Sequence, residues 1–259
     1  MLAKEEIIRR LDRPVTVEIY EETGSTNTLA AQHAKEAKDK TPALIIARNQ
    51  TKGRGTRGRS FFCERGKGLY MTLVCYPDAD VKTAHLATPA AGVAVAKALC
   101  SVAGVDAQIK WVNDVVIKDK KLCGILAEAK LRSGNKSLEY VIIGIGINLY
   151  SAEFPPEIAY SATSLDMYSR AFDENELCAE IVNNLLGYLE ALDAAPFMDE
   201  YKALSSVIGR CVVFENGGLS MTGRAVDINR QGNLVVDIES SDKRYIITAG
   251  DVSVKVSDC

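Results

Sequence analysis

The spacing of apolar residues divides the chain into two regions. Up to residue 208, apolar residues recur at helical spacing in some segments and form short or alternating runs in others. Helices are predicted at residues 3–12, 27–38, 88–103, 174–192 and 196–205, and strands at 15–21, 43–48, 69–75, 108–111, 115–117, 122–131 and 138–148. Short turns join several of these strands, so we expect an α+β fold with a mostly antiparallel sheet.

From residue 209 onward the apolar residues alternate with a period of two. Five short segments, mostly separated by Gly or Asn turns, occupy residues 211–217, 220–229, 233–239, 244–250 and 251–256. Strands of this length and spacing are typical of a small β-barrel, here SH3-like and of about 50 residues. The sequence therefore predicts two domains, at residues 1–208 and 209–259.

Composition limits the classes of function. The chain has 259 residues, of which 47% are hydrophobic and 25% charged, as in an ordinary globular protein. Its net charge of −3 does not favour general nucleic-acid binding, yet residues 52–67 hold six cations and one anion. The chain has no apolar run of about 18 residues and no signal core, so we expect no membrane span and a cytoplasmic location. Seven scattered cysteines and two histidines argue against zinc and for unpaired thiols in a reducing compartment.

The most distinctive segment is a basic, glycine-rich loop at residues 50–59. Residues 53–58 read Gly-Arg-Gly-Thr-Arg-Gly and match G-x-G-x-x-G. A strand rather than a helix follows, which excludes a dinucleotide-binding turn, and the chain has no H-R-D or D-F-G segment of a kinase. A solvated hairpin tip is the alternative. The arginines among glycines, with Phe61 and Phe62 as an apolar anchor, favour a lid that closes on an anion.

A second polar segment stands at the end of a predicted strand. Lys110 and Trp111 precede Asn113 and Asp114, so an amide and a carboxylate lie beside the single tryptophan. These side chains could orient a nucleotide or hold Mg²⁺ through oxygen ligands. An Asx turn is the alternative interpretation.

Glycines in two predicted strands suggest a place for a ligand. Lys121 stands at the mouth of one strand and Gly124 follows within it, while Gly144 and Gly146 interrupt the next. Strands that lack side chains on one face would leave a slot with a backbone floor, where a flat organic ligand could lie.

Taken in order, these residues resemble the biotin protein ligases, the family of biotin–[acetyl-CoA-carboxylase] ligases. The resemblance runs from about Thr23 to the carboxyl end. Its pieces are Ser25-Thr26-Asn27, residues 50–59, Lys110-Trp111-x-Asn113-Asp114, Lys121-x-x-Gly124-Ile125-Leu126-x-Glu128, Gly144-x-Gly146-Ile147-Asn148 and Thr163-Ser164-Leu165. The family implies a class II synthetase-like catalytic domain, ATP and Mg²⁺ as requirements, and biotin as a substrate. The product would be biotinyl-5′-AMP, from which biotin passes to a lysine of a biotin carboxyl carrier protein.

The resemblance also implies roles for individual residues. Those expected to bind biotin are Ser25, Thr26, Asn27, Gln50, Gly53, Arg54, Gly55, Thr56, Lys121, Gly124, Leu126 and Gly144. Those expected to bind the nucleotide are Arg57, Arg59, Trp111, Asn113, Lys121, Asn148 and Phe154. Asp114 would hold Mg²⁺, and the catalytic residues would be Lys121, Arg54 and Asp114.

Two positions depart from the family pattern. Val112 stands where many relatives have proline, which the fold should tolerate. Thr56 stands where many bacterial members have an arginine that helps to retain the adenylate. We therefore expect this chain to release its adenylate faster than such relatives do, unless Arg57 compensates.

Partners and rival functions follow from the same resemblance. Fourteen residues precede Val15, too few for the winged-helix domain of bifunctional relatives, so we expect no DNA binding. A homodimer formed through a sheet edge is compatible with the sequence. The nearest rival is a lipoate ligase of the same superfamily, and a more distant one is a non-catalytic biotin-binding module or regulator.

Overall fold

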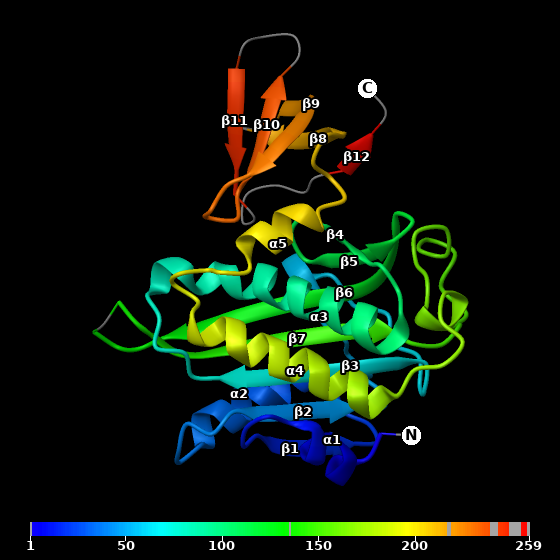
Figure 1. Cartoon of the computed structure of the whole chain (residues 1–259), viewed down its shortest axis with the longest axis vertical. Coiled ribbons are helices and arrows are strands. Elements are labelled where there is room, and N and C mark those ends of the chain that lie inside the picture. Colours follow the sequence, from blue (N-terminus) through cyan, green and yellow to red (C-terminus); the bar gives the residue numbers. More distant parts are fainter. Residues whose placement is uncertain (1, 135, 217–218, 239–242, 249–254, 258–259) are drawn as a thin grey trace.

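The computed structural model describes residues 2–134, 136–216, 219–238, 243–248 and 255–257 (Figure 1). The helices in these residues are α1 Lys4–Arg10, α2 Thr26–Glu36, α3 Ala87–Ala103, α4 Glu174–Glu190 and α5 Met198–Ala203, with short 3₁₀ helices η1 Thr56–Gly58, η2 Val81–Leu86 and η3 Leu165–Met167. The strands are β1 Thr16–Tyr20, β2 Ala43–Ala47, β3 Gly68–Cys75, β4 Gln108–Lys110, β5 Asp114–Ile117, β6 Lys120–Leu131, β7 Leu138–Asn148, β8 Cys211–Asn216, β9 Leu219–Ile228, β10 Leu234–Ile238, β11 Lys243–Ile247 and β12 Lys255–Ser257. The predicted α+β fold is confirmed, and up to residue 238 the boundaries lie within two residues of the predicted ones.

The first seven strands form one sheet, in the order β1-β2-β3-β7-β6-β5-β4. β1 pairs with β2 in parallel, and every other pair described is antiparallel. In the register, Thr72 faces Gly144, and Gly146 faces Gly124 on the next strand. Since side chains alternate between the faces of a strand, these residues share one face, and their neighbours Leu73, Ile143 and Ile145 share the other.

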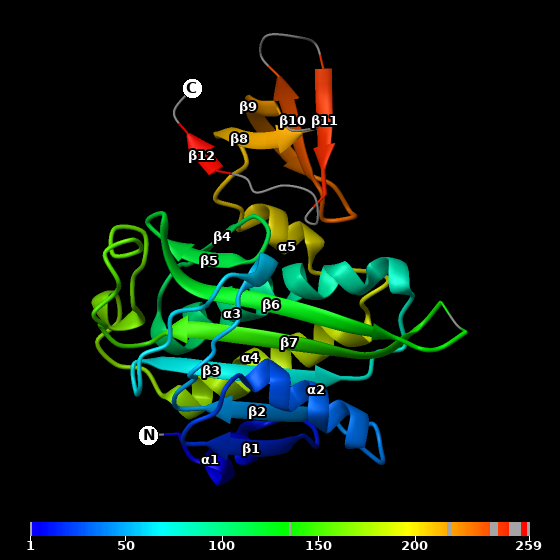
Figure 2. The same ribbon diagram turned by 180° about the vertical axis from the view of Figure 1, so that it is seen from behind.

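Helices cover the two faces of this sheet unequally. α3 and α4 lie across one face, whereas α2 and the basic loop lie across the other (Figures 1 and 2). The main hydrophobic core fills the space under α3 and α4 and contains Leu73, Ile143 and Ile145. A smaller cluster lies under α2, with Ala30 and Ile45 among its members. The face under α2 is therefore left partly open for a site.

The segment Val81–Ala103 is long and apolar enough to cross a membrane by composition alone. However, 67% of its most apolar stretch is buried inside the protein. A helix buried between a sheet and a second helix is apolar on most of its surface for that reason. Its composition thus reflects its place in the core.

The C-terminal strands form a second sheet, in the order β11-β10-β9-β8-β12 among the described residues. It stands beside α5 and the β4 edge of the large sheet (Figure 1). Four of the five predicted segments coincide with strands, while most of the fifth, residues 251–254, lies outside the described residues. The boundary between residues 208 and 209 stays a prediction. Cys211 is disulfide-bonded, so the expectation of unpaired thiols is wrong for that residue.

Candidate active site

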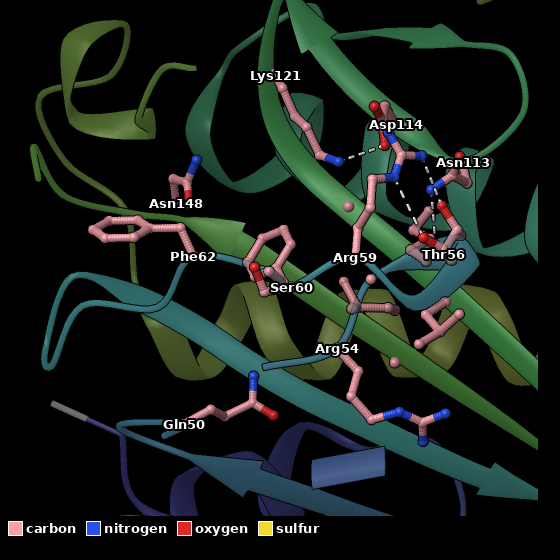
Figure 3. Close-up of a pocket in the computed structure, with 18 of the residues that line it drawn as sticks. Gln50, Arg54, Thr56, Arg59, Ser60, Phe62, Asn113, Asp114, Lys121 and Asn148 are labelled. Atoms are coloured by element: carbon pink, nitrogen blue, oxygen red, sulfur yellow. Dashed lines mark hydrogen bonds and ion pairs between the residues drawn. The ribbon is translucent and has the colours of Figure 1, made fainter. Parts of the chain in front are cut away.

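A cavity of about 310 Å³ opens on the α2 face of the large sheet. It lies between the start of α2, the basic loop, the strands β6 and β7, and the segment around residues 154–162 (Figure 3). The sequence-predicted residues that line it are Ser25, Thr26, Asn27, Gln50, Arg54, Gly55, Thr56, Arg59, Asn113, Asp114, Lys121, Gly124, Leu126, Gly144, Asn148 and Phe154. Segments spread over more than a hundred residues of sequence are therefore brought to one place.

One end of the cavity is a network of uncharged polar groups. Ser25 precedes α2 at its N-cap but makes no side-chain cap bond. Instead, Gln50 Oε1 accepts from the backbone N–H of Thr26 at 2.8 Å and from its hydroxyl at 3.0 Å. The hydroxyl of Thr72 contacts the Thr26 hydroxyl and the Asn27 amide oxygen, both at 2.8 Å. Gln50 thus supplies the cap that a helix start requires, and Ser25 is left at the cavity wall.

Cys63 supports this network from behind. The Gln50 side-chain amide donates to the Cys63 sulfur at 3.3 Å. Burial raises the pKa of the Cys63 thiol to about 11, and hydrogen bonds with Gln50 and Tyr70 oppose part of that rise. The thiol is therefore neutral at physiological pH, and its sulfur accepts the hydrogen bond from the uncharged Gln50 amide as a neutral group. Sequence reasoning gave Cys63 no role.

Arg54 is held by a carboxylate of this chain. Its guanidinium donates two hydrogen bonds to Glu128, at 2.8 Å and 3.1 Å. Glu128 also accepts from the Asn27 amide at 3.0 Å. The basic loop, α2 and β6 therefore meet at one carboxylate, which the sequence had suggested only as a member of a motif.

The opposite end of the cavity is charged. The Lys121 ammonium lies 2.7 Å from Oδ1 of Asp114, and Figure 3 shows both side chains at the end away from Gln50. The adjacent Asn113 is fixed by its own hydrogen bonds to β6: its amide donates to the Ile125 carbonyl at 3.1 Å, and its carbonyl accepts from the Ile125 N–H at 2.9 Å. Backbone bonds from Lys121 to Ser161 and Thr163 brace the lysine as well.

The residues at this end fit Mg²⁺. Asp114 Oδ1 is buried, and its close partner among the described residues is the Lys121 ammonium. No cluster of three His, Cys, Asp or Glu side chains suited to a metal occurs within the described part of the chain. Mg²⁺ is commonly held by one or two carboxylates together with substrate phosphates and water, so the single Asp114 carboxylate at this end of the cavity suits it.

The glycine floor is present but is partly covered by Phe61, which follows the basic loop, and by Asn27 of α2. A Cβ on Gly146 would come within 2.6 Å of the Phe61 ring, and one on Gly124 within 2.9 Å. A Cβ on Gly144 would come within 2.0 Å of the Asn27 amide oxygen. The expectation of a bare slot is therefore wrong for this structure: the glycines accommodate the protein's own side chains, and a ligand would lie beside them.

The basic loop has internal structure. Arg54 and Ser60 form an antiparallel bridge, and the Gly55 N–H donates to the Arg59 carbonyl at 2.7 Å. At the tip, the Arg59 guanidinium donates to the Thr56 hydroxyl at 3.2 Å. The loop is thus a small hairpin with its tip at η1, which keeps Thr56 and Arg59 at the cavity.

Three predicted site residues are not at the cavity wall. Gly53 packs against the Phe61 backbone, where a Cβ would meet the carbonyl oxygen at 2.6 Å. Arg57 has a left-handed backbone, with φ of 57°, at the loop tip. Trp111 is buried elsewhere and bonded to Gly232.

Sequence reasoning also missed several wall residues. These are Ser60, Ile158, Ser161 and Ala162. Phe61 and Phe62, which the sequence suggested only as an apolar anchor of the basic loop, also line the cavity. Phe62 lies near Phe154, with ring centroids 5.8 Å apart. No spacing marks these residues, because they come from two loops with irregular structure.

Comparisons of the sequence with known proteins match this chain to one family. The family model of the biotin/lipoate A/B protein ligase family matches residues 20–148, and that of the biotin protein ligase C terminal domain matches residues 207–255. The chain is 32% identical to a biotin–[acetyl-CoA-carboxylase] ligase of Mycobacterium tuberculosis, over 91% of this chain and 88% of the relative. It is 26% identical to the bifunctional ligase/repressor BirA of Escherichia coli, over 100% of this chain and 79% of the relative.

Solved structures show the same fold. A biotin protein ligase from Aquifex aeolicus in complex with biotin and ATP superposes with a TM-score of 0.73, at 24% identity over 93% of this chain and 99% of that one. Such a low identity by itself shows the fold alone. The match to the mycobacterial relative over most of both sequences goes further: this chain belongs to the biotin protein ligase family.

Proposed function

We propose that this chain activates biotin with ATP and transfers it to a lysine of a biotin carboxyl carrier protein. The observation that carries the proposal is the division of one cavity into an uncharged hydrogen-bonding end and a charged end. Biotin has the same division, with a neutral ureido ring at one end and a carboxylate at the other. Family membership supports the same activity.

The uncharged end suits the ureido ring. Ser25, Thr26, Asn27 and Gln50 offer donors and acceptors on a wall that is at most 5% exposed at the first three positions. A ligand that forms hydrogen bonds with buried polar groups binds more tightly, and a ligand that leaves those groups unpaired binds less tightly. We assign biotin specificity to these four residues and Arg54, with Gly55, Gly124, Leu126 and Gly144 as the adjoining walls.

The charged end suits the reacting groups. In the first step a biotin carboxylate oxygen attacks the α-phosphorus of ATP, an O–P bond forms, and pyrophosphate leaves. Carboxylate and phosphate repel each other by about 4 kcal/mol at 4 Å and an effective dielectric of 20. The Lys121 ammonium lies at the cavity wall and offsets that repulsion, and Arg59 lines the same cavity.

The second step releases the nucleotide. An unprotonated lysine amine of the carrier attacks the acyl carbon of the mixed anhydride, so a C–N bond forms, the C–O bond to AMP breaks, and the amine loses a proton. The basic loop and the 154–162 segment, which flank the cavity, would exclude water from the anhydride. We assign Asn113, Asn148, Arg59 and Phe154 to the nucleotide.

We propose Asp114 as the protein ligand of Mg²⁺. When bound, the ion would neutralise charge on the ATP phosphates. The same carboxylate is paired with Lys121 in the structure and holds the ammonium at the cavity wall.

We further propose a cytoplasmic enzyme that acts on a carboxylase carrier and does not bind DNA. The net charge of −3 supports the last point. If the chain forms a homodimer through an edge of the large sheet, the available edge is β1, because Ile109 on β4 already bonds to Leu204 and Ser206.

Lipoate is the second candidate substrate, because the matching family includes lipoate ligases. The C-terminal match and the named relatives favour biotin. An adenylation assay with ATP and either acid at equal concentration tests the choice. We expect biotinyl-AMP to form at least a hundredfold faster, and comparable rates would contradict the assignment.

A further inference from the structure

Trp111, which the sequence placed at the nucleotide, contacts the C-terminal sheet instead. Its indole N–H donates to the Gly232 carbonyl at 2.9 Å, and the residue is 7% exposed. Gly232 belongs to the turn at residues 229–233, between β9 and β10. Asn229 stiffens this turn by accepting from the N–H groups of Gln231 and Asn233, both at 3.0 Å. The indole therefore joins two units of the fold through a well-formed turn.

The segment around Trp111 is held from a second direction by residues that lead into the C-terminal sheet. The Tyr201 hydroxyl on α5 donates to the Val112 carbonyl at 3.0 Å. The N–H of Ile109 donates to the Leu204 carbonyl at 2.8 Å, and the Ile109 carbonyl accepts from the Ser206 N–H at 2.9 Å. Residues 109–112 are thus bonded on both sides to the part of the chain beyond residue 197.

The same segment continues directly into the charged end of the cavity. Asn113 and Asp114 follow within three residues of Trp111, and Asn113 is bonded to Ile125 of β6. Asp114 carries the ion pair with Lys121. A continuous series of contacts therefore runs from the turn at residues 229–233, through Trp111, to the two residues assigned to nucleotide and Mg²⁺.

We propose that Trp111 is a positioning residue, through which the C-terminal sheet sets the placement of Asn113 and Asp114 for Mg²⁺-ATP. The inference rests on the proposed function for the identity of the ligand, but not for the contacts. The C-terminal sheet thereby has a role in nucleotide binding. It has none in biotin binding, because the contacts described above do not include Gln50 or Thr26.

The replacement Trp111→Phe tests this proposal, since it keeps an aromatic ring and removes the N–H donor. We expect the KM for ATP and the Mg²⁺ concentration for half-saturation to rise about fivefold, the factor associated with one hydrogen bond. Biotin affinity measured by calorimetry should stay within twofold of wild type, which also shows that the variant folds. An unchanged KM for ATP, or an equal loss of biotin affinity, would overturn the proposal.

His85→Ala is the matched control. The His85 ring contacts the neighbouring Gln231 carbonyl at 2.8 Å, so this change weakens the same junction without touching residues 109–114. We expect the KM for ATP and the Mg²⁺ concentration for half-saturation to be unchanged. If His85→Ala raises the KM for ATP as much as Trp111→Phe does, general loosening explains the effect and the role of Trp111 is refuted.

A direct readout uses the wild-type chain and does not depend on turnover. The chain has one tryptophan, so its ¹H–¹⁵N spectrum contains a single indole cross-peak. We expect this peak to exchange slowly with solvent and to shift when Mg²⁺-ATP is added to the biotin-bound chain. A peak that exchanges rapidly or ignores Mg²⁺-ATP overturns the proposal, even if Trp111→Phe fails to fold. A wild-type chain that makes no biotinyl-AMP would instead refute the proposed function.

Discussion

The Phe61 ring lies on the backbone of Gly146, so closely that a Cβ on that glycine would come within 2.6 Å of the ring. Gly124 stands opposite Gly146 in the register of β6 and β7, and it faces the same ring. A loop residue is therefore seated in a depression that two strands form by lacking side chains. We interpret this contact as the anchor that holds the basic loop over the cavity.

Gly146→Ala should accordingly disturb the loop. The added methyl group would push the Phe61 ring away at a cost of about 1–3 kcal/mol, as overpacking does in protein cores. We expect biotin affinity to fall about tenfold, and trypsin cleavage within residues 52–59 to accelerate.

Phe61→Ala in the same chain decides what the glycine accommodates. If Gly146 accommodates the ring, the second replacement should make Gly146→Ala nearly neutral in a double-mutant cycle. If Gly146→Ala lowers biotin affinity equally in the Phe61→Ala background, Gly146 makes room for the ligand rather than for Phe61. The proposed anchoring role of Phe61 is then refuted.

Glu128 should matter for biotin because it orients two residues of the biotin end. Glu128→Gln keeps the shape of the side chain and weakens its hold on Arg54. Both side chains are more than one-third exposed, so solvent screens the pair and we expect only about a fivefold loss of biotin affinity by calorimetry. Glu139→Gln, an exposed carboxylate on β7, is the control and should change nothing. A loss confined to ATP binding would contradict this assignment.

Thr56→Arg tests the expectation that this chain retains its adenylate poorly. Thr56 lines the cavity next to Arg59, so an arginine there would add a cation near the phosphate. We expect the release of biotinyl-AMP, followed by rapid filtration, to slow about tenfold. Thr51→Arg adds the same charge at an exposed position and should leave the rate unchanged. An unaltered rate in Thr56→Arg refutes the hypothesis.

The Cys63 thiol should make stability depend on alkaline pH. Burial raises its pKa in the folded state to about 11, above the ordinary value of 9.0. Because the pKa is raised in the folded state, the stabilisation of the fold by the protonated thiol is fully present below pH 9. It is lost as pH rises towards 11. The free energy of unfolding in urea should therefore fall over this range by roughly 2–3 kcal/mol through Cys63.

Cys63→Ala provides the comparison. The buried thiols Cys75, Cys123 and Cys178 have raised pKa values for the same reason, so the variant should lose part of the pH dependence and keep the rest. If the free energy of unfolding of Cys63→Ala falls with pH as steeply as that of wild type, Cys63 is not buried in solution.

Periodicity predicted the elements of this fold because each strand or helix buries a face within its own few residues. It also placed Gly124, Gly144 and Gly146 on one face, because alternation along a strand follows from local geometry. The polar motifs around Gln50 and Lys121 were predicted as one site through the family resemblance.

The partners of individual side chains could not be predicted in this way. Trp111 turns to Gly232, 121 residues away, and Arg54 turns to Glu128, 74 residues away. The seat of Phe61 likewise depends on how a loop folds back on a sheet. Tertiary packing determines these contact partners, and the local spacing of residues in the sequence does not indicate them.

The most direct test of biotin activation by this chain is a single-turnover assay for biotinyl-5′-AMP by mass spectrometry. We predict that the adenylate forms only when biotin, ATP and Mg²⁺ are all present. We further predict that Lys121→Ala abolishes formation while retaining biotin binding, whereas Lys120→Ala, at an exposed neighbouring position, behaves as wild type. No adenylate from the wild-type chain, or equal adenylate from Lys121→Ala, would contradict these predictions.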